Sequence, residues 1–105
     1  SSFSSSFSSG STANSNVKTS LSSEVVASVR RLLENSYQIT TEHADKRRFR
    51  SSSWHTCKPV SANRLHDVVA QLEGCLTDHQ GEYVRLIGID TKAKRRVHEE
   101  IIQRP

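Results

Sequence analysis

Apolar residues recur at helical spacing between Ser22 and Asn35. They fall at positions i, i+1, i+4, i+7 and i+8, which form one face of an α-helix. These residues are Val25, Val26, Val29, Leu32 and Leu33. Ser22 suits the N-cap of this helix, and Leu21 before it can pack against the first turn. Asn35 and Ser36 predict the end of the helix.

A second stretch with the same spacing predicts a second helix, which begins at Ser61 or Asn63 and ends at His79. Gly81 lies just beyond its end, where glycine often terminates helices. The apolar face of this helix consists of Leu65, Val68, Val69, Leu72 and Leu76. Two amphipathic helices in a short chain need a third element on which to bury their apolar faces.

Strands supply that element. The β-branched residues near Ile39 favour a strand from Tyr37 to His43, and Phe49 to Cys57 offers a second strand. Asp45 to Arg48 between them is typical of a tight hairpin loop of about three residues. In a strand, Trp54 is expected in the core.

The near-continuous apolar stretch from Glu82 to Asp90 predicts a central strand. From Thr91 onward the pattern is ambiguous, and residues 97–102 fit a short helix slightly better than a strand. The order of helix, strand, strand, helix, strand and tail indicates an α+β fold, with an antiparallel β-sheet and helices packed on one face.

Composition changes the picture at the N-terminus. Nine of the first sixteen residues are serine, and such a segment buries too little apolar surface to offset its ordering entropy. We therefore expect residues 1–20 to form a disordered Ser-rich linker and residues 21–105 to form one domain. The chain shows neither a signal peptide nor a membrane-spanning run. It is expected to be a cytoplasmic module of a longer multidomain protein.

Charge points to an acidic partner. The 105-residue chain has a formal net charge of +4, and a basic cluster occupies the predicted hairpin loop and the start of the second predicted strand. This basic cluster consists of Lys46, Arg47, Arg48 and Arg50. Nucleic acid, an acidic protein surface or plain solvation would each explain it. A second basic group, composed of Lys92, Lys94, Arg95 and Arg96, fits a solvated surface.

The stretch YVRLIGIDTKAKRRVHEEIIQRP, Tyr83 to Pro105, resembles the C-terminal signature of the Rubisco small subunit. LSSEVVASVR, TEHADKRRFRSSSW and the final IIQRP are closer to the small-subunit-like modules of cyanobacterial β-carboxysome scaffold proteins, which occur in tandem copies. A related module occurs on some cyanobacterial Rubisco activases. The resemblance covers about residues 21–105 and implies a Rubisco small-subunit-like fold.

The resemblance also implies a function. A module of this kind is a non-catalytic adaptor that binds assembled Rubisco holoenzyme, with its large and small subunits, and condenses it for carboxysome assembly. Anchoring a Rubisco activase is the alternative within the family. The expected loop of about three residues is much shorter than that of a genuine small subunit, which favours docking on the holoenzyme rather than replacing a subunit. Arg47 and Arg48 of the basic cluster become the main candidate contacts, because guanidinium groups pair well with carboxylates.

For Cys57 and Cys75, the resemblance implies a redox-responsive pair that is reduced in the cytosol and oxidised to a disulfide in the carboxysome. Geometry sets a condition on this pairing. A helix that began at Ser61 would place Cys75 about 21 Å along its axis, beyond the roughly 14 Å reach of the connection. A start at Asn63 would allow the bond. Without the resemblance, two ordinary thiols would be the simpler interpretation.

The spacing of the histidine and cysteine residues gives little support to a catalytic or metal site. The five histidines are scattered, and the chain contains neither CxxC nor HExxH, so we expect neither a metal nor a cofactor. A tight hairpin would pair His43 with Ser51. His55 and Cys57 would share a strand face without a third group to orient the base. A nucleic-acid-binding module, in which Phe49 and Trp54 stack on bases, is the alternative from another class, but nucleic acid is not the expected partner.

Overall fold

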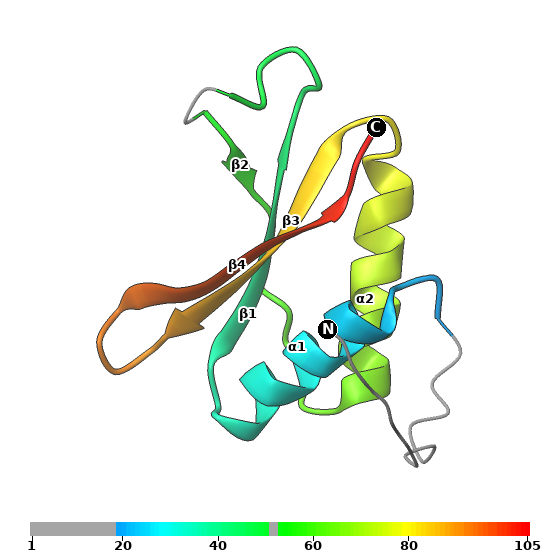
Figure 1. The fold of residues 1–105 in the computed structure, drawn as a ribbon. Coiled ribbons are helices and arrows are strands. Elements are labelled where there is room, and N and C mark those ends of the chain that lie inside the picture. The colour runs from blue at the N-terminus through cyan, green and yellow to red at the C-terminus, as the bar shows by residue number, and fades with distance from the viewer. Residues whose placement is uncertain (1–18, 51–52) are drawn as a thin grey trace, which may run out of the picture.

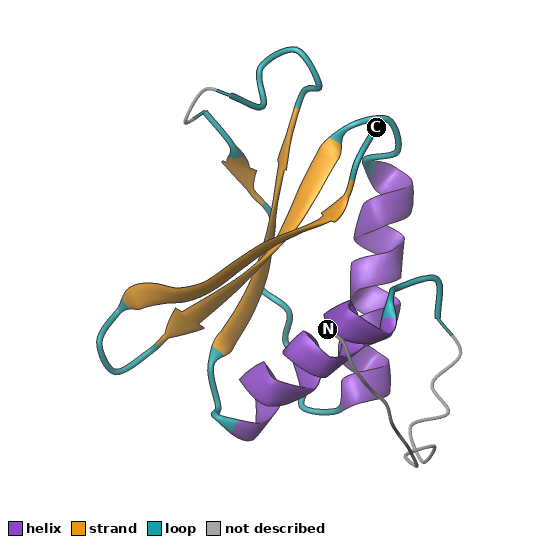
Figure 2. Ribbon diagram, viewed as in Figure 1, coloured by secondary structure: helices purple, strands orange, loops and turns teal. Residues whose placement is uncertain are grey.

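The computed structural model describes residues 19–50 and 53–105, which form two layers (Figures 1 and 2). One layer is an antiparallel sheet with strand order β2-β1-β3-β4. The other layer consists of two helices on one face of that sheet. In chain order, the elements are α1 (Ser23–Glu34), β1 (Gln38–Ala44), β2 (His55–Thr56), α2 (Leu65–Asp78), β3 (Tyr83–Asp90) and β4 (Arg95–Gln103). The predicted α+β class is confirmed.

The helix α1 matches its prediction closely. Ser22 takes the extended backbone conformation of an N-cap, although its side chain makes no capping hydrogen bond. Leu21 before it is buried in the core, as a hydrophobic residue preceding the cap often is. Asn35 follows the last helical residue, and Ser36 turns the chain with a φ of 59°. The apolar spacing was therefore sufficient to place this element.

The helix α2 begins later than predicted, at Leu65 rather than at Ser61 or Asn63. The connection before it stays extended beside β1, because the Val60 amide donates to the Ile39 carbonyl oxygen over 2.9 Å. Val60 cannot be helical while it pairs with this strand, and the chain stays non-helical up to Leu65. The late start meets the geometric condition for bringing Cys57 close to Cys75.

The connection between β1 and β2 differs most from its prediction. It spans residues 45–54, and the described residues 46–50 form turns, so the loop of about three residues and the strand beginning at Phe49 were both wrong. His43 pairs with His55, whereas Ser51, its predicted partner, lies outside the described residues. Tertiary contacts explain the longer loop, because the Phe49 ring stacks on that of Tyr83 with centroids 4.2 Å apart.

The tail forms a strand, and the expected short helix was wrong. Strand β4 pairs with β3 along its length, with bulges that shift the register near both ends. Along β4, His98, Glu100 and Ile102 are half-buried, whereas Val97 and Ile101 are exposed. This alternation has the period of a strand. The edge of β3 needs a hydrogen-bonding partner, and that need overrides the weak local preference for helix.

The core lies between the helices and the face of β1 and β3 that they cover. Its fully buried members include Val29, Val68, Leu72 and Leu86. Helix α1 crosses β3 closely at Gly88, where an added Cβ would lie 2.5 Å from a Leu32 methyl carbon. In the described part of the chain, no helix is long and apolar enough to cross a bilayer.

Residues at the predicted boundary of the linker contact the domain. The predicted linker, residues 1–20, lies outside the described residues except for Thr19 and Ser20. The Thr19 hydroxyl and the Ser20 amide both donate to the Glu73 carboxylate on α2, over 2.6 and 2.7 Å. These two hydrogen bonds lower the pKa of Glu73. Thr19 and Ser20, at the end of the predicted linker, are therefore attached to α2.

Two glycines are expected to respond to alanine with opposite signs. Gly74 is an exposed residue inside α2 with open space around an added Cβ, so Gly74→Ala should raise the free energy of unfolding by about 0.5–1 kcal/mol. Gly81 has a φ of +87°, and Gly81→Ala should lower that free energy by about 1 kcal/mol. Urea unfolding measures both changes, and changes of the same sign would contradict this account.

Candidate functional site

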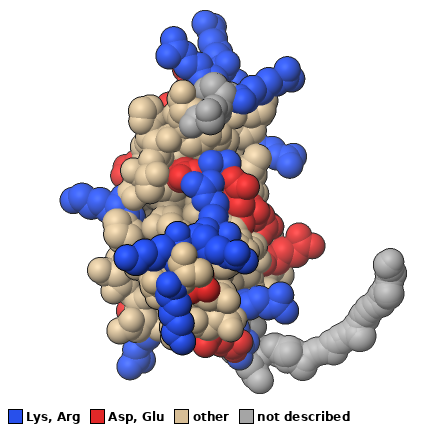
Figure 3. All heavy atoms as spheres, turned by 90° about the vertical axis from the view of Figure 1, so that its left-hand side faces the viewer, with Lys and Arg blue, Asp and Glu red and all other residues tan. Residues whose placement is uncertain are grey.

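The basic cluster projects from the turn that follows β1. Lys46, Arg47, Arg48 and Arg50 are all exposed. Asp45 organises the turn, because its carboxylate accepts from the Arg47 amide over 3.1 Å and its carbonyl oxygen accepts from the Arg48 amide over 2.9 Å. Figure 3 shows Lys and Arg side chains gathered at this end of the molecule. The structure thus groups the predicted contact residues, and it places Arg50 in the turn rather than at the start of a strand.

Aromatic residues attach this turn to the sheet. The Trp54 indole N–H donates to the Phe49 carbonyl oxygen over 3.0 Å, and the Arg85 guanidinium lies 4.2 Å from the centre of the indole ring. Trp54 is half-buried on the sheet face that the helices leave uncovered, so the expectation that it lies in the core was wrong. Phe49 and Trp54 attach the basic cluster to β3, because both rings pack against the Tyr83 ring and the Trp54 ring also contacts Arg85.

A network of charges crosses the uncovered face beside this turn. Glu42 is buried in the sheet and accepts from the Arg85 Nε over 2.7 Å and from the Arg96 Nη2 over 3.2 Å. Glu99 also pairs with both arginines. Arg96 therefore has a structural role, in contrast to the predicted solvated surface. Lys92, Lys94 and Arg95 are exposed in and beside the hairpin between β3 and β4.

The two cysteines lie close together and are free thiols. Cys57 follows β2 and remains paired with β1, since its amide donates to the Thr41 carbonyl oxygen over 2.8 Å. Cys75 lies on α2, and the two Sγ atoms are 3.8 Å apart. The S–S bond of a disulfide is about 2.05 Å long. The two sulfur atoms would therefore need to approach each other by only a modest distance. Burial raises the pKa of the Cys75 thiol, although a hydrogen bond with the Thr41 hydroxyl opposes the shift.

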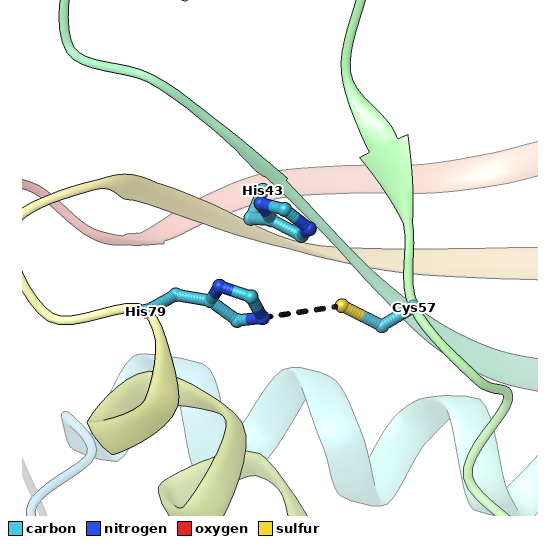
Figure 4. A group of neighbouring side chains, drawn as sticks. All are labelled: His43, Cys57 and His79. Carbon is cyan, nitrogen blue, oxygen red and sulfur yellow. Dashed lines mark hydrogen bonds between the residues drawn. The ribbon is translucent and has the colours of Figure 1, made fainter.

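Two histidines, His43 and His79, lie beside the Cys57 thiol (Figure 4). The His79 Nε2 lies 3.8 Å from the Cys57 Sγ. The His43 ring stacks on the His79 ring with centroids 3.8 Å apart. Both Nδ1 atoms approach one Glu82 carboxylate oxygen, at 3.5 and 3.4 Å. Burial, followed by repulsion from His79, lowers the pKa of His43. The His55 ring also stacks on the His43 ring, with centroids 5.4 Å apart.

Reasoning from the sequence did not find this grouping. His43, Cys57 and His79 each offer a ligand atom, and these atoms lie within 4.8 Å of one another. They come from β1, the segment after β2 and the end of α2, so no short motif contains them. One signal was available: Cys75 and His79 stand four residues apart on a predicted helix and therefore share a face.

Comparison with known proteins assigns the family. The profile of "Ribulose bisphosphate carboxylase, small chain" matches residues 12–105, which is most of the chain and includes every helix and strand described above. The chain belongs to the Rubisco small-chain family. As a small-chain family member, it has the fold that the motif IGID and the final QRP led us to expect.

Close relatives of this small-chain domain are larger proteins. It is 60% identical to "Carboxysome assembly protein CcmM" of Nostoc sp. over 81% of the chain, and 58% identical to the protein of that name from Synechococcus elongatus, again over 81%. It is 49% identical to "Ribulose bisphosphate carboxylase/oxygenase activase" of Anabaena sp. over 81% of the chain. The alignments cover 15%, 16% and 20% of these relatives. The small-chain domain thus corresponds to a minor part of each.

Proposed function

We propose that this chain is a non-catalytic adaptor module that binds assembled Rubisco and, in tandem copies, condenses it during β-carboxysome assembly. The main support is an exposed basic cluster on a small-chain fold that is closely similar to carboxysome assembly proteins. Asp45 and the aromatic anchors hold the turn in shape, so little ordering entropy would oppose binding. A carboxylate-rich groove on Rubisco is the complementary surface.

Co-sedimentation tests the binding step. The chain should pellet with purified Rubisco at low ionic strength and remain in the supernatant without it. Binding should weaken as salt rises, because exposed charges are screened beyond about 8–10 Å at physiological ionic strength. A chain that stays in the supernatant at every salt concentration would overturn the proposal.

Docking beside the small subunit, rather than in its place, is a separate part of the proposal. The expected short loop no longer supports it, because the connection after β1 spans residues 45–54. The subunit content of the pellet decides this point. Docking on intact holoenzyme predicts an unchanged ratio of large to small subunits, whereas replacement predicts the loss of small subunits as the chain binds.

Condensation would follow from multivalency. One module should bind without cross-linking, whereas two copies joined by a flexible linker should produce turbidity with Rubisco, because a tether raises the effective concentration of the second site. The activase relative offers an alternative parent for the module. Identity is higher to the carboxysome assembly proteins, which favours the scaffold.

Oxidation is expected to join Cys57 and Cys75 and to weaken the hold on Rubisco. The Sγ separation of 3.8 Å supports this pairing. The bond should stabilise the chain by about 3 kcal/mol on the chain-entropy model. Intact mass should fall by two hydrogen atoms after diamide treatment, and thiol labelling should cease. Cys75→Ser is the control, and two reactive thiols after oxidation would exclude the bond.

Nucleic acid remains the alternative partner from another class. The structure makes it less favourable, because stacking on bases needs exposed aromatic faces. The Phe49 ring is stacked on Tyr83, and the Trp54 ring lies beneath the Arg85 guanidinium. A gel shift with single-stranded and double-stranded oligonucleotides should show only weak binding that is independent of sequence.

A further inference from the structure

Side chains that bind soft metal ions converge beneath the sheet, and Figure 4 shows His43, Cys57 and His79 among them. The cysteine–histidine cluster consists of His43, Cys57 and His79, whose ligand atoms lie together, and of Cys75, whose Sγ lies 3.8 Å from that of Cys57. His79 is the C-cap of α2, and Cys75 lies one turn earlier on the same helix. His43 comes from the central strand β1. Rigid elements therefore supply three of the four groups.

The separations suit a tetrahedral ion. Zinc binds sulfur at about 2.3 Å and nitrogen at about 2.0–2.1 Å, so its ligand atoms lie about 3.3–3.8 Å apart. The Cys57 Sγ lies 3.8 Å from the His79 Nε2 and 3.8 Å from the Cys75 Sγ. The ligand atoms of His43, Cys57 and His79 lie within 4.8 Å of one another. The His43 and His79 rings stack nearly parallel with centroids 3.8 Å apart, and the Cys75 Sγ lies outside this group of three. Metal binding therefore requires one imidazole to turn its ring plane toward the ion and the Cys75 side chain to move toward it.

Glu82 provides an independent indication of a metal. Imidazoles that bind zinc usually direct their other ring nitrogen at a carboxylate, which fixes the tautomer and the ring orientation. Here one Glu82 oxygen lies 3.5 Å from the His43 Nδ1 and 3.4 Å from the His79 Nδ1. Both Nε2 atoms are thereby left for a ligand, and the His79 Nε2 already faces the Cys57 thiol.

We propose that His43, Cys57, Cys75 and His79 bind one zinc ion, with Glu82 positioning the two imidazoles. Two thiolates and two imidazoles in tetrahedral geometry select zinc over the harder divalent ions. A pocket of about 390 Å³, lined by Cys57, Cys75 and His79 among others, gives an ion access to the cluster. The spacing of the sequence predicted no such site. The site does not depend on Rubisco binding.

Cobalt(II) is the spectroscopic probe for this site. The reduced, chelator-treated 105-residue chain is titrated with cobalt chloride and then with zinc chloride. We expect tetrahedral cobalt bands with thiolate charge transfer, saturation at one ion per chain, and loss of the bands as zinc displaces cobalt. Zinc should also protect both thiols from alkylation. Absence of tetrahedral bands would overturn the proposal, whatever the result with Rubisco.

Variants distinguish a site with all four ligands from metal binding by the two thiols without the histidines. His79→Ala should weaken cobalt binding at least about tenfold, and Glu82→Gln should weaken it about 10–100-fold. His66→Ala, an exposed histidine on the same helix, should change nothing. If circular dichroism shows that the His79→Ala variant does not fold, the cobalt affinity of the Glu82→Gln variant is the deciding measurement. Unchanged affinity in a folded Glu82→Gln variant would contradict the role of Glu82 and, with an unchanged His79 variant, the site itself.

Discussion

The Arg47→Asp, Arg48→Asp double variant should lose co-sedimentation with Rubisco while retaining the circular dichroism of the parent chain. Both side chains are exposed in the turn after β1, so their replacement leaves the core intact. If each guanidinium meets a carboxylate on Rubisco, its reversal replaces attraction by repulsion and costs about 2 kcal/mol or more. Together the two changes should weaken binding by at least about 100-fold.

A matched charge reversal distinguishes a specific contact from general attraction. Lys92→Asp, Lys94→Asp changes the net charge by the same amount in another exposed turn. Binding by this variant should be close to that of the parent at physiological salt. Equal loss in both double variants would show that only the net charge matters, and undiminished binding by the arginine variant would remove the basic cluster from the interface.

Glu42→Gln should lower the free energy of unfolding by about 2–3 kcal/mol. The Glu42 side chain is only 7% exposed, and its carboxylate accepts from Arg85, Arg96 and the Thr56 hydroxyl. Neutralising it leaves the Arg85 guanidinium, which is 18% exposed, with less compensation for its lost hydration. Arg85 also covers the Trp54 ring, so near-ultraviolet circular dichroism should change too.

Glu99→Gln is the control for this prediction. Glu99 pairs with the same two arginines but is 47% exposed, so water already screens its charge. Urea unfolding should show a loss of less than about 1 kcal/mol, because exposed ion pairs contribute little. Equal losses of unfolding free energy in the two variants would mean that the burial of Glu42 does not increase its contribution to stability.

The spacing of the apolar residues correctly predicted the elements that bury one face against the core. Val29 and Leu72 are almost fully buried, and each lies on the predicted face of its helix. The edge strand β4 was not predictable in this way, since Val97 and Ile101 remain exposed and Ile102 fits either period. Its strand conformation depends on pairing with β3, which is a tertiary interaction.

The two candidate sites also differ in how far the sequence could predict them. The basic cluster is local in sequence, so composition alone could find it. The proximity of His79 to Cys57 depends instead on where α2 begins and on the pairing of His43 with His55. A tight hairpin would have changed that pairing. Long-range register therefore decides the cysteine–histidine cluster, and local turn preferences predicted that register wrongly.

The attachments of the described chain to α2 have a mechanical consequence. At one end, Thr19 is bonded to Glu73 of α2. At the other, the Gln103 side-chain amide donates to carbonyl oxygens at the end of α2, those of Leu76 and His79, over 3.2 and 2.9 Å. If modules of this kind are tethered as proposed, part of the tension between them would pass through this helix. The turn that carries Arg47 lies outside that load path and would keep its shape under strain.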